Sequence, residues 1–143
     1  MRIDALLQRK GQSVATIAPA ATVGDALGHL AERNIGALVV SSDGSRVEGI
    51  VSERDVVRRL HSHGPATLAE PVSEIMSSEV HTCTPEAEVE SLVSLMTNRR
   101  IRHVPVVRDG SLVGIVSIGD VVKSRMDELE ADRQALVDYI YAR

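Results

Sequence analysis

The segment GIVSERDVV, residues 49–57, recurs later in the chain as GIVSIGDVV, residues 114–122. Upstream of these segments, residues 14–40 align with residues 80–106 at a constant offset of 66 positions. Downstream of a turn that contains Asp-Gly in both halves, the offset is 65, so the second half has lost one residue there. Exposed turns are where insertions and deletions are tolerated best. The chain is therefore an internal duplication, and its fold is a repeated unit.

Each copy of the unit predicts the element order βαββα. A short β-branched strand comes first, and a helix follows at Thr22, where Thr-x-x-Asp is typical of a capping box. Two strands then flank the Asp-Gly turn, and a second helix begins at Ser52. The paired strands are expected at residues 37–40 and 47–51 in the first copy and near residues 103–107 and 112–116 in the second.

A unit of about 60 residues buries too little of its surface to be stable alone. We therefore expect an α+β fold in which two βαββα repeats pack as a sandwich about a pseudo-two-fold axis and leave two related clefts between them. The expected boundaries are residues 1–66 for the first repeat, 67–125 for the second and 126–143 for a C-terminal amphipathic helix. This helix either packs back on its own domain or forms a dimer contact.

The composition argues against several classes of protein. A formal net charge of −4 disfavours nucleic-acid binding, which needs a basic surface. With two Tyr and no Phe or Trp, the chain also lacks the aromatic platforms that stack single-stranded bases. The single cysteine fits a reducing compartment, and no apolar run is long enough for a membrane span. We expect a soluble, cytoplasmic protein with no nucleic-acid or membrane partner.

The duplicated motif Gly-x-x-Ser-x-x-Asp places a hydroxyl and a carboxylate at the start of a helix. The serines are Ser52 and Ser117, and the aspartates are Asp55 and Asp120. The strand-edge glycine admits close approach of another backbone or a ligand. The helix N-terminus favours an anion such as phosphate, and the carboxylate can accept hydrogen bonds from ribose hydroxyls, so the pattern indicates a nucleotide site. It is also compatible with two capping boxes, each worth about 1 kcal/mol, that bind no ligand.

The repeat resembles the cystathionine-β-synthase (CBS) domain, and the tandem pair is similar to a Bateman module. The resemblance rests on both Gly-Ile-Val-Ser-x-x-Asp segments, on the Arg-His-Val-Pro-Val strand at residues 102–106 and on the Thr-x-x-Pro sequences at residues 16–19 and 82–85. It covers about residues 1–125. It implies a disc-like homodimer of two modules, with clefts that bind AMP, ADP, ATP, S-adenosylmethionine or a related adenosine ligand as a regulatory signal.

By the same resemblance, the serines would contact phosphate and the aspartates would hold the ribose. Arg54 and Arg102 would add phosphate contacts, since guanidinium groups match phosphate oxygens, although arginines at a helix end also occur as solvated charges. Pro105 stands where the first repeat has Val39, so the two sites need not be equal. The implied adenine-pocket residues are Thr16, Ile17, Ala37 and Leu38 in the first repeat and Thr82, Cys83, His103, Val104 and Pro105 in the second.

The resemblance implies a regulatory binding module and not an enzyme. Inosine-monophosphate dehydrogenase carries a CBS pair as an insert, but its catalytic barrel of about 250 residues does not fit within this chain. His81 and Cys83 have no further ligands at metal-site spacing, so neither a metal nor a catalytic cofactor is expected. The module would act in trans on an unknown protein partner or through its own dimer. The alternative is a structural dimer scaffold whose clefts stay empty.

Overall fold

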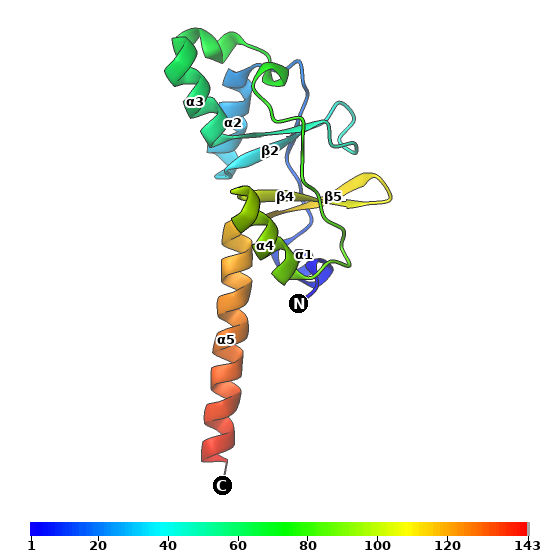
Figure 1. Cartoon of the computed structure of the whole chain (residues 1–143), viewed down its shortest axis with the longest axis vertical. Coiled ribbons are helices and arrows are strands. Elements are labelled where there is room, and N and C mark those ends of the chain that lie inside the picture. The colour runs from blue at the N-terminus through cyan, green and yellow to red at the C-terminus, as the bar shows by residue number, and fades with distance from the viewer. Residues whose placement is uncertain (143) are drawn as a thin grey trace.

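The computed structural model describes residues 1–142, and Figure 1 shows two small units, with a long helix projecting from one of them. The first repeat has the predicted order βαββα, and in the second a single bridge at Cys83 takes the place of the lead-in strand. Two 3₁₀ segments, Gly64–Ala69 and Val72–Glu74, connect the repeats. The helices and strands are α1 (Ile3–Lys10), β1 (Thr16–Ile17), α2 (Val23–Arg33), β2 (Ala37–Val40), β3 (Gly49–Ser52), α3 (Glu53–His63), α4 (Val89–Arg99), β4 (His103–Arg108), β5 (Ser111–Ser117) and α5 (Ile118–Tyr141).

The two sheets repeat the same pairing in register. In the first sheet, β1 runs parallel to β2 with Ile17 opposite Val40, and β2 pairs antiparallel with β3. In the second, Cys83 makes a parallel bridge to Val106, and β4 pairs antiparallel with β5. The bridged residues of the second repeat are the positions 66 residues beyond those of the first. The structure thus confirms the duplication and its offset.

The N-terminal helix α1 is an element that the repeat pattern does not predict, and it completes the second repeat instead of the first. The amide of Ile3 donates to the carbonyl of Ala87 at 2.9 Å. In the first repeat, the amide of Val72 donates to the carbonyl of Ala21 at 2.7 Å. Because Ala21 and Ala87 are equivalent by the 66-residue offset, the segment between the repeats covers the first repeat in the way that α1 covers the second.

The glycine of each Gly-x-x-Ser motif makes room for these covering segments. A Cβ atom on Gly49 would lie 2.5 Å from Sδ of Met76, and one on Gly114 would lie 2.7 Å from Cδ2 of Leu7. Contacts this short cannot be accommodated without displacing the neighbour. The space beside each glycine therefore holds a side chain of the protein itself and not a ligand.

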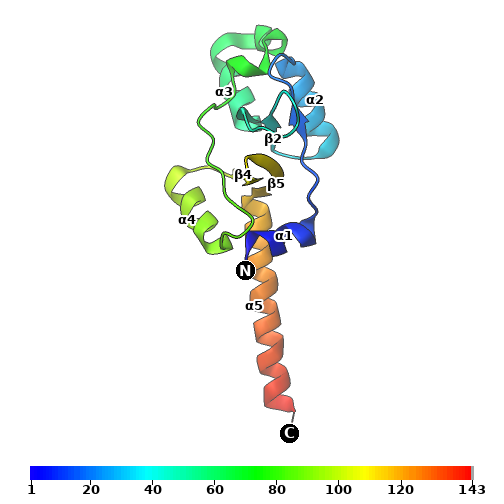
Figure 2. The ribbon, with the colours of Figure 1, turned by 90° about the vertical axis from the view of Figure 1, so that its right-hand side faces the viewer.

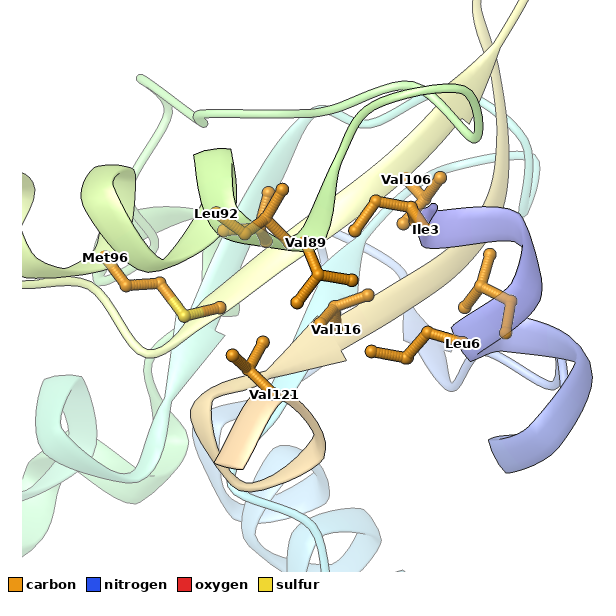
Figure 3. Packing of buried hydrophobic residues seen from close by; sticks show 10 residues of the cluster. Ile3, Leu6, Val89, Leu92, Met96, Val106, Val116 and Val121 are labelled. Carbon is orange, nitrogen blue, oxygen red and sulfur yellow. The ribbon is translucent and has the colours of Figure 1, made fainter. Parts of the chain in front are cut away.

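Each repeat has its own hydrophobic core between its sheet and its helices. Helix α1 contributes Ile3 and Leu6 to the core of the second repeat, where they lie near Val116 of β5 (Figure 3). Val39 of β2 and Pro105 of β4 stand at equivalent positions and are buried outside both cores. These residues lie on the sheet faces turned away from the helices. The two sheets therefore cover each other as the predicted sandwich (Figures 1 and 2).

The predicted C-terminal helix is present as the last part of α5, but it extends away from the second repeat. Val121 and Ser124 are buried near its start, and Arg125 forms a salt bridge with Glu90 of α4. Beyond this point the helix projects as a stalk and is largely exposed (Figures 1 and 2). The alternative in which the extension packs back on its own domain is therefore wrong. Like the other helices within residues 1–142, α5 lacks the apolar character needed to cross a membrane.

Candidate functional site

The Ser-x-x-Asp segments form complete capping boxes at the starts of α3 and α5. In the first, the amide of Asp55 donates to Oγ of Ser52 at 3.3 Å, and the amide of Ser52 donates to Oδ2 of Asp55 at 2.8 Å. The second has the same two hydrogen bonds, at 3.1 and 2.8 Å, between Ser117 and Asp120. Each motif lines a different cleft at the junction of the two repeats.

The first cleft, which we call the arginine cleft, is formed by both repeats. Its volume is about 350 Å³, within the range of small-molecule sites. Ser52 and Asp55 come from the first repeat, and Arg102 and His103 come from the second, so the structure brings these predicted residues together. The remaining lining residues are Gly36, Ile50, Glu53, Arg54, Arg58, Ser77, Arg99, Arg100 and Ile101.

Five arginines make the arginine cleft strongly cationic. Arg54 and Arg58 come from α3, and the other three come from residues 99–102, where α4 ends. None of the five forms a salt bridge with another residue in the described part of the chain. Two carboxylates, on Glu53 and Asp55, offset only part of this charge. The cleft therefore favours an anion that carries more than one negative charge.

Asp55 keeps part of its carboxylate free. Its Oδ2 accepts hydrogen bonds from the amide and the hydroxyl of Ser52, at 2.8 and 3.0 Å. Its Oδ1 accepts no hydrogen bond from residues 1–142. A free carboxylate oxygen can accept hydroxyl donors of a ligand, and the N-terminus of α3 beside it stabilises negative charge.

In the second cleft, which we call the lysine cleft, the equivalent carboxylate of Asp120 already forms an ion pair within the chain. Nζ of Lys10, the last residue of α1, lies 2.5 Å from Oδ2 of Asp120 and 2.7 Å from the carbonyl oxygen of Ile115. Burial by itself would raise the pKa of Asp120, but hydrogen bonds from Lys10 and Ser117 outweigh it and hold that pKa below its ordinary value. The lysine cleft, about 480 Å³, is also lined by Ser13, Ala15, Arg33, Asn34, Ile35, Gly36, Ala37 and His103.

His103 lies where the two clefts meet, because it lines both of them together with Gly36. A Cβ atom on Gly36 would lie 3.2 Å from the imidazole ring, so the two residues are in close contact. Burial lowers the pKa of His103, and the Asp120 carboxylate offsets only part of that effect. The ring is therefore mainly neutral at pH 7 and can donate one hydrogen bond and accept another.

Most of the nine residues implied for the adenine pocket lie outside both clefts. Ala37 lines the lysine cleft and His103 lines both clefts. Leu38 and Val104 are fully buried in the two cores. The other five lie elsewhere: Thr16 and Ile17 in a separate hollow beside α2, Thr82 on the surface, Cys83 against the second core and Pro105 between the sheets.

Among the cleft residues that the sequence prediction missed, three have a particular part in the site: Arg58, Gly36 and Lys10. Arg58 lies one turn after Asp55 on α3, so its spacing from the motif was an available signal. Gly36 precedes β2 and leaves room for the ring of His103. Lys10 has no local signal, because it is 110 positions from Asp120 and belongs to a helix that the repeat does not predict.

Cys83 and the metal-ligating types of side chain are the remaining candidates for chemistry. Residues 1–142 contain no group of three or more His, Cys, Asp and Glu side chains that could hold a metal ion. Burial raises the pKa of Cys83 to about 11. Its thiol is therefore protonated at neutral pH and is a weak nucleophile.

Comparison with known proteins accounts for the duplication and the paired clefts. The CBS domain profile matches residues 10–62 and again residues 72–127. The chain belongs to the CBS domain family. The two matches correspond to the two repeats of this CBS pair. Most of α1 and most of the α5 stalk lie outside them.

Curated relatives of the CBS pair come from a plant, from bacteria and from archaea. The chain is 41% identical over 123 residues to the mitochondrial CBS domain-containing protein CBSX3 of Arabidopsis thaliana. That match covers 83% of this chain but about 60% of the longer plant protein. It is 34% identical over 118 residues to the CBS domain-containing protein YhcV of Bacillus subtilis, which covers 82% of this chain and 83% of that protein.

Solved structures share the whole architecture of the CBS pair. The CBS-domain containing protein ATU1752 from Agrobacterium tumefaciens is 44% identical with a TM-score of 0.84, over 87% of this chain and 99% of that one. The CBS domain protein PAE2072 from Pyrobaculum aerophilum, solved in complex with AMP, is 30% identical with a TM-score of 0.75, over 84% of this chain and 89% of that one. The α+β sandwich of two repeats is thus confirmed.

Proposed function

We propose that this CBS pair is a regulatory module that binds an adenosine nucleotide in the arginine cleft. The observation that carries the proposal is the free Oδ1 of Asp55 in a cleft lined by five arginines. A nucleotide matches both features, because its ribose hydroxyls are hydrogen-bond donors and its phosphates are anions that guanidinium groups bind well. The AMP complex of the Pyrobaculum aerophilum relative supports the same class of ligand.

The charge of the arginine cleft favours AMP, ADP or ATP over S-adenosylmethionine. The sulfonium group of S-adenosylmethionine is positively charged and would be placed among five guanidinium groups. Each further phosphate of a nucleotide adds negative charge that these groups can pair with. We therefore expect the affinity to rise from AMP to ADP to ATP.

A ligand in the arginine cleft would contact both repeats, since Ser52 and Asp55 belong to one and Arg102 and His103 to the other. Binding would then favour one relative orientation of the repeats over others. Such a preference can shift the population of conformations that a partner protein or a second copy of the chain recognises. In this proposal the CBS pair is a non-catalytic regulator that acts in trans or through its own oligomer.

A structural scaffold with empty clefts is the second candidate function. The completeness of both capping boxes favours it, because Ser52 and Ser117 already have helix-capping roles without any ligand. In a scaffold, the aspartates would contribute only to the stability of α3 and α5. The two candidates therefore differ in whether any adenosine ligand binds at all.

A thermal-shift panel on the purified chain distinguishes these functions. A ligand present at about 100 times its Kd adds about 2.7 kcal/mol to the free energy of unfolding. For a domain of this size, that corresponds to a rise in Tm on the order of 5–15 °C. With all ligands at one concentration, we expect the rise to be largest with ATP, smaller with ADP and AMP, and absent with S-adenosylmethionine. A panel without any shift would contradict nucleotide binding and favour the scaffold.

A pair of arginine variants tests whether the arginine cleft is the site. Arg102→Gln removes one guanidinium group from the cleft, and we expect it to weaken ATP binding by about tenfold or more, as for the loss of a charged hydrogen bond. Arg108→Gln is the matched control, because Arg108 is exposed at the far end of β4 and lies outside the cleft. Equal affinities of the two variants would place the nucleotide elsewhere.

A further inference from the structure

The stalk formed by α5 carries an apolar surface that extends beyond the unit shared with the family. The CBS domain match ends at residue 127, whereas α5 continues to Tyr141. None of residues 125–142 is buried. Six large hydrophobic side chains of this segment are more than half exposed, and four of them are aliphatic: Met126, Leu129, Leu136 and Ile140.

These hydrophobic residues follow a heptad pattern. We define the α5 stripe as the six positions Val122, Met126, Leu129, Arg133, Leu136 and Ile140, which are spaced alternately four and three residues apart. This alternation places all six on one narrow face of the helix. Such a face is the seam along which two helices associate into a left-handed coiled coil.

We propose that the α5 stripe pairs with the α5 stripe of a second copy of this chain, as a parallel two-stranded coiled coil. The stripe has less than three heptads, which is short for an isolated coiled coil. However, α5 is already capped by Ser117 and anchored in the domain by Val121, so association does not have to nucleate the helix. This proposal does not depend on whether the arginine cleft binds a nucleotide.

The charged residues that flank the α5 stripe favour the parallel orientation. In parallel register, Arg125 would lie opposite Glu130 of the second copy, and this attractive pair occurs twice in the dimer. Arg125 remains more than half exposed despite its salt bridges within the chain. In an antiparallel pair whose stripes overlap fully, Glu130 would face Glu130 of the second copy and Asp132 would face Asp132. Both of these pairs are repulsive.

Arg133 is the one charged residue on the α5 stripe. A polar side chain at a seam position lowers the stability of a coiled coil but restricts its register and oligomeric state. Its long side chain can carry the guanidinium group to the edge of the seam, where Asp132 of the second copy would lie. Arg133→Leu should therefore lower the dissociation constant of the dimer.

Disulfide cross-linking tests the pairing and its orientation together. In a Cys83→Ser background, Leu136→Cys puts the single thiol on the α5 stripe, and Ala131→Cys puts it on the opposite face of α5. In the parallel coiled coil the two thiols at position 136 face each other within disulfide range. We expect mild oxidation to link Leu136→Cys into a covalent dimer and to leave Ala131→Cys largely unlinked. Equal linking of both variants, or no linking of Leu136→Cys, would overturn the proposal.

Sedimentation of the full chain gives an independent test. We expect the wild-type chain to sediment at twice its mass of 15.4 kDa. Leu129→Glu combined with Leu136→Glu should raise the dissociation constant by at least about tenfold, because the paired state loses two buried leucines per chain. Ala131→Glu with Asp138→Glu retains the seam and should dimerise like the wild type. Because a dimer held by the repeats alone would also have twice the mass, the comparison of the variants and not the wild-type mass carries the test. A wild-type chain of single mass at every concentration, or a double leucine variant with an unchanged dissociation constant, would contradict the pairing.

Discussion

At the scale of single residues, two aspartates in the same motif have different neighbours. One oxygen of Asp55 is free in a cationic cleft, whereas Asp120 is held by the ammonium group of Lys10. The duplication copied the motif into both repeats, but the ion pair comes from α1, which lies before the first repeat. The two clefts are therefore chemically unequal although their motifs are the same.

The lowered pKa of His103, which lies between the clefts, predicts how the stability of the fold depends on pH. Burial lowers its pKa below the ordinary 6.5, Asp120 and Glu53 favour protonation of the ring, and Lys10 and Arg102 oppose it. Because the folded pKa is the lower one, the unfolded chain binds more protons as the pH falls below about 6.5. The free energy of unfolding should therefore decrease from about pH 7.5 to about pH 5.5.

Urea denaturation of the wild type and of His103→Gln at these two pH values measures this effect. The Gln variant has no ring to protonate, so its free energy of unfolding should fall less on acidification. An equal fall in both proteins would show that burial of His103 does not couple its protonation to folding.

The sequence predicted the positions of the motif residues better than those of the adenine pocket. Ser52, Asp55 and Arg102 line one cleft. Leu38 does not, because neighbouring residues on a strand point to opposite faces of the sheet. Since Ala37 lines a cleft, Leu38 must face the core, and it is fully buried there. Only one side chain of such a pair can face the cleft.

At the scale of elements, α1 is a segment that the repeat pattern does not predict. Leu7 of α1 and Met76 between the repeats contact the two motif glycines in the same way. They are 69 positions apart, whereas the first helices and the strands that follow them repeat at 66, and the residues around them share little sequence. Alignment of the two halves therefore predicts the strands and the main helices but not the segments that cover them.

Truncation of Leu7 tests whether α1 is part of the second core. Leu7 is buried and fills the space beside Gly114. Leu7→Ala should lower the free energy of unfolding by about 2–5 kcal/mol, as for other buried leucines. Gln8→Ala, at an exposed position of the same helix, is the control. A loss in urea denaturation no larger than that of the control would show that α1 does not support the fold.

At the scale of the whole molecule, a pseudo-symmetric core carries two features that break its symmetry. Helix α1 supplies the lysine that engages one cleft, and α5 extends as a stalk from the second repeat only (Figure 1). The two clefts share His103 and Gly36 in their linings. The sequence predicted the sandwich and the helical tail, but the inequality of the clefts arises only from contacts between distant segments.

The central claim is that the arginine cleft is the nucleotide site and the lysine cleft is not. Calorimetric titration of ATP into the wild type, Asp55→Asn and Asp120→Asn tests it directly. We predict one ATP per chain in the wild type, an affinity at least about tenfold lower in Asp55→Asn, and wild-type affinity in Asp120→Asn. Loss of binding in Asp120→Asn with retention in Asp55→Asn would assign the nucleotide to the lysine cleft. Absence of binding to the wild type would contradict the sensor function altogether.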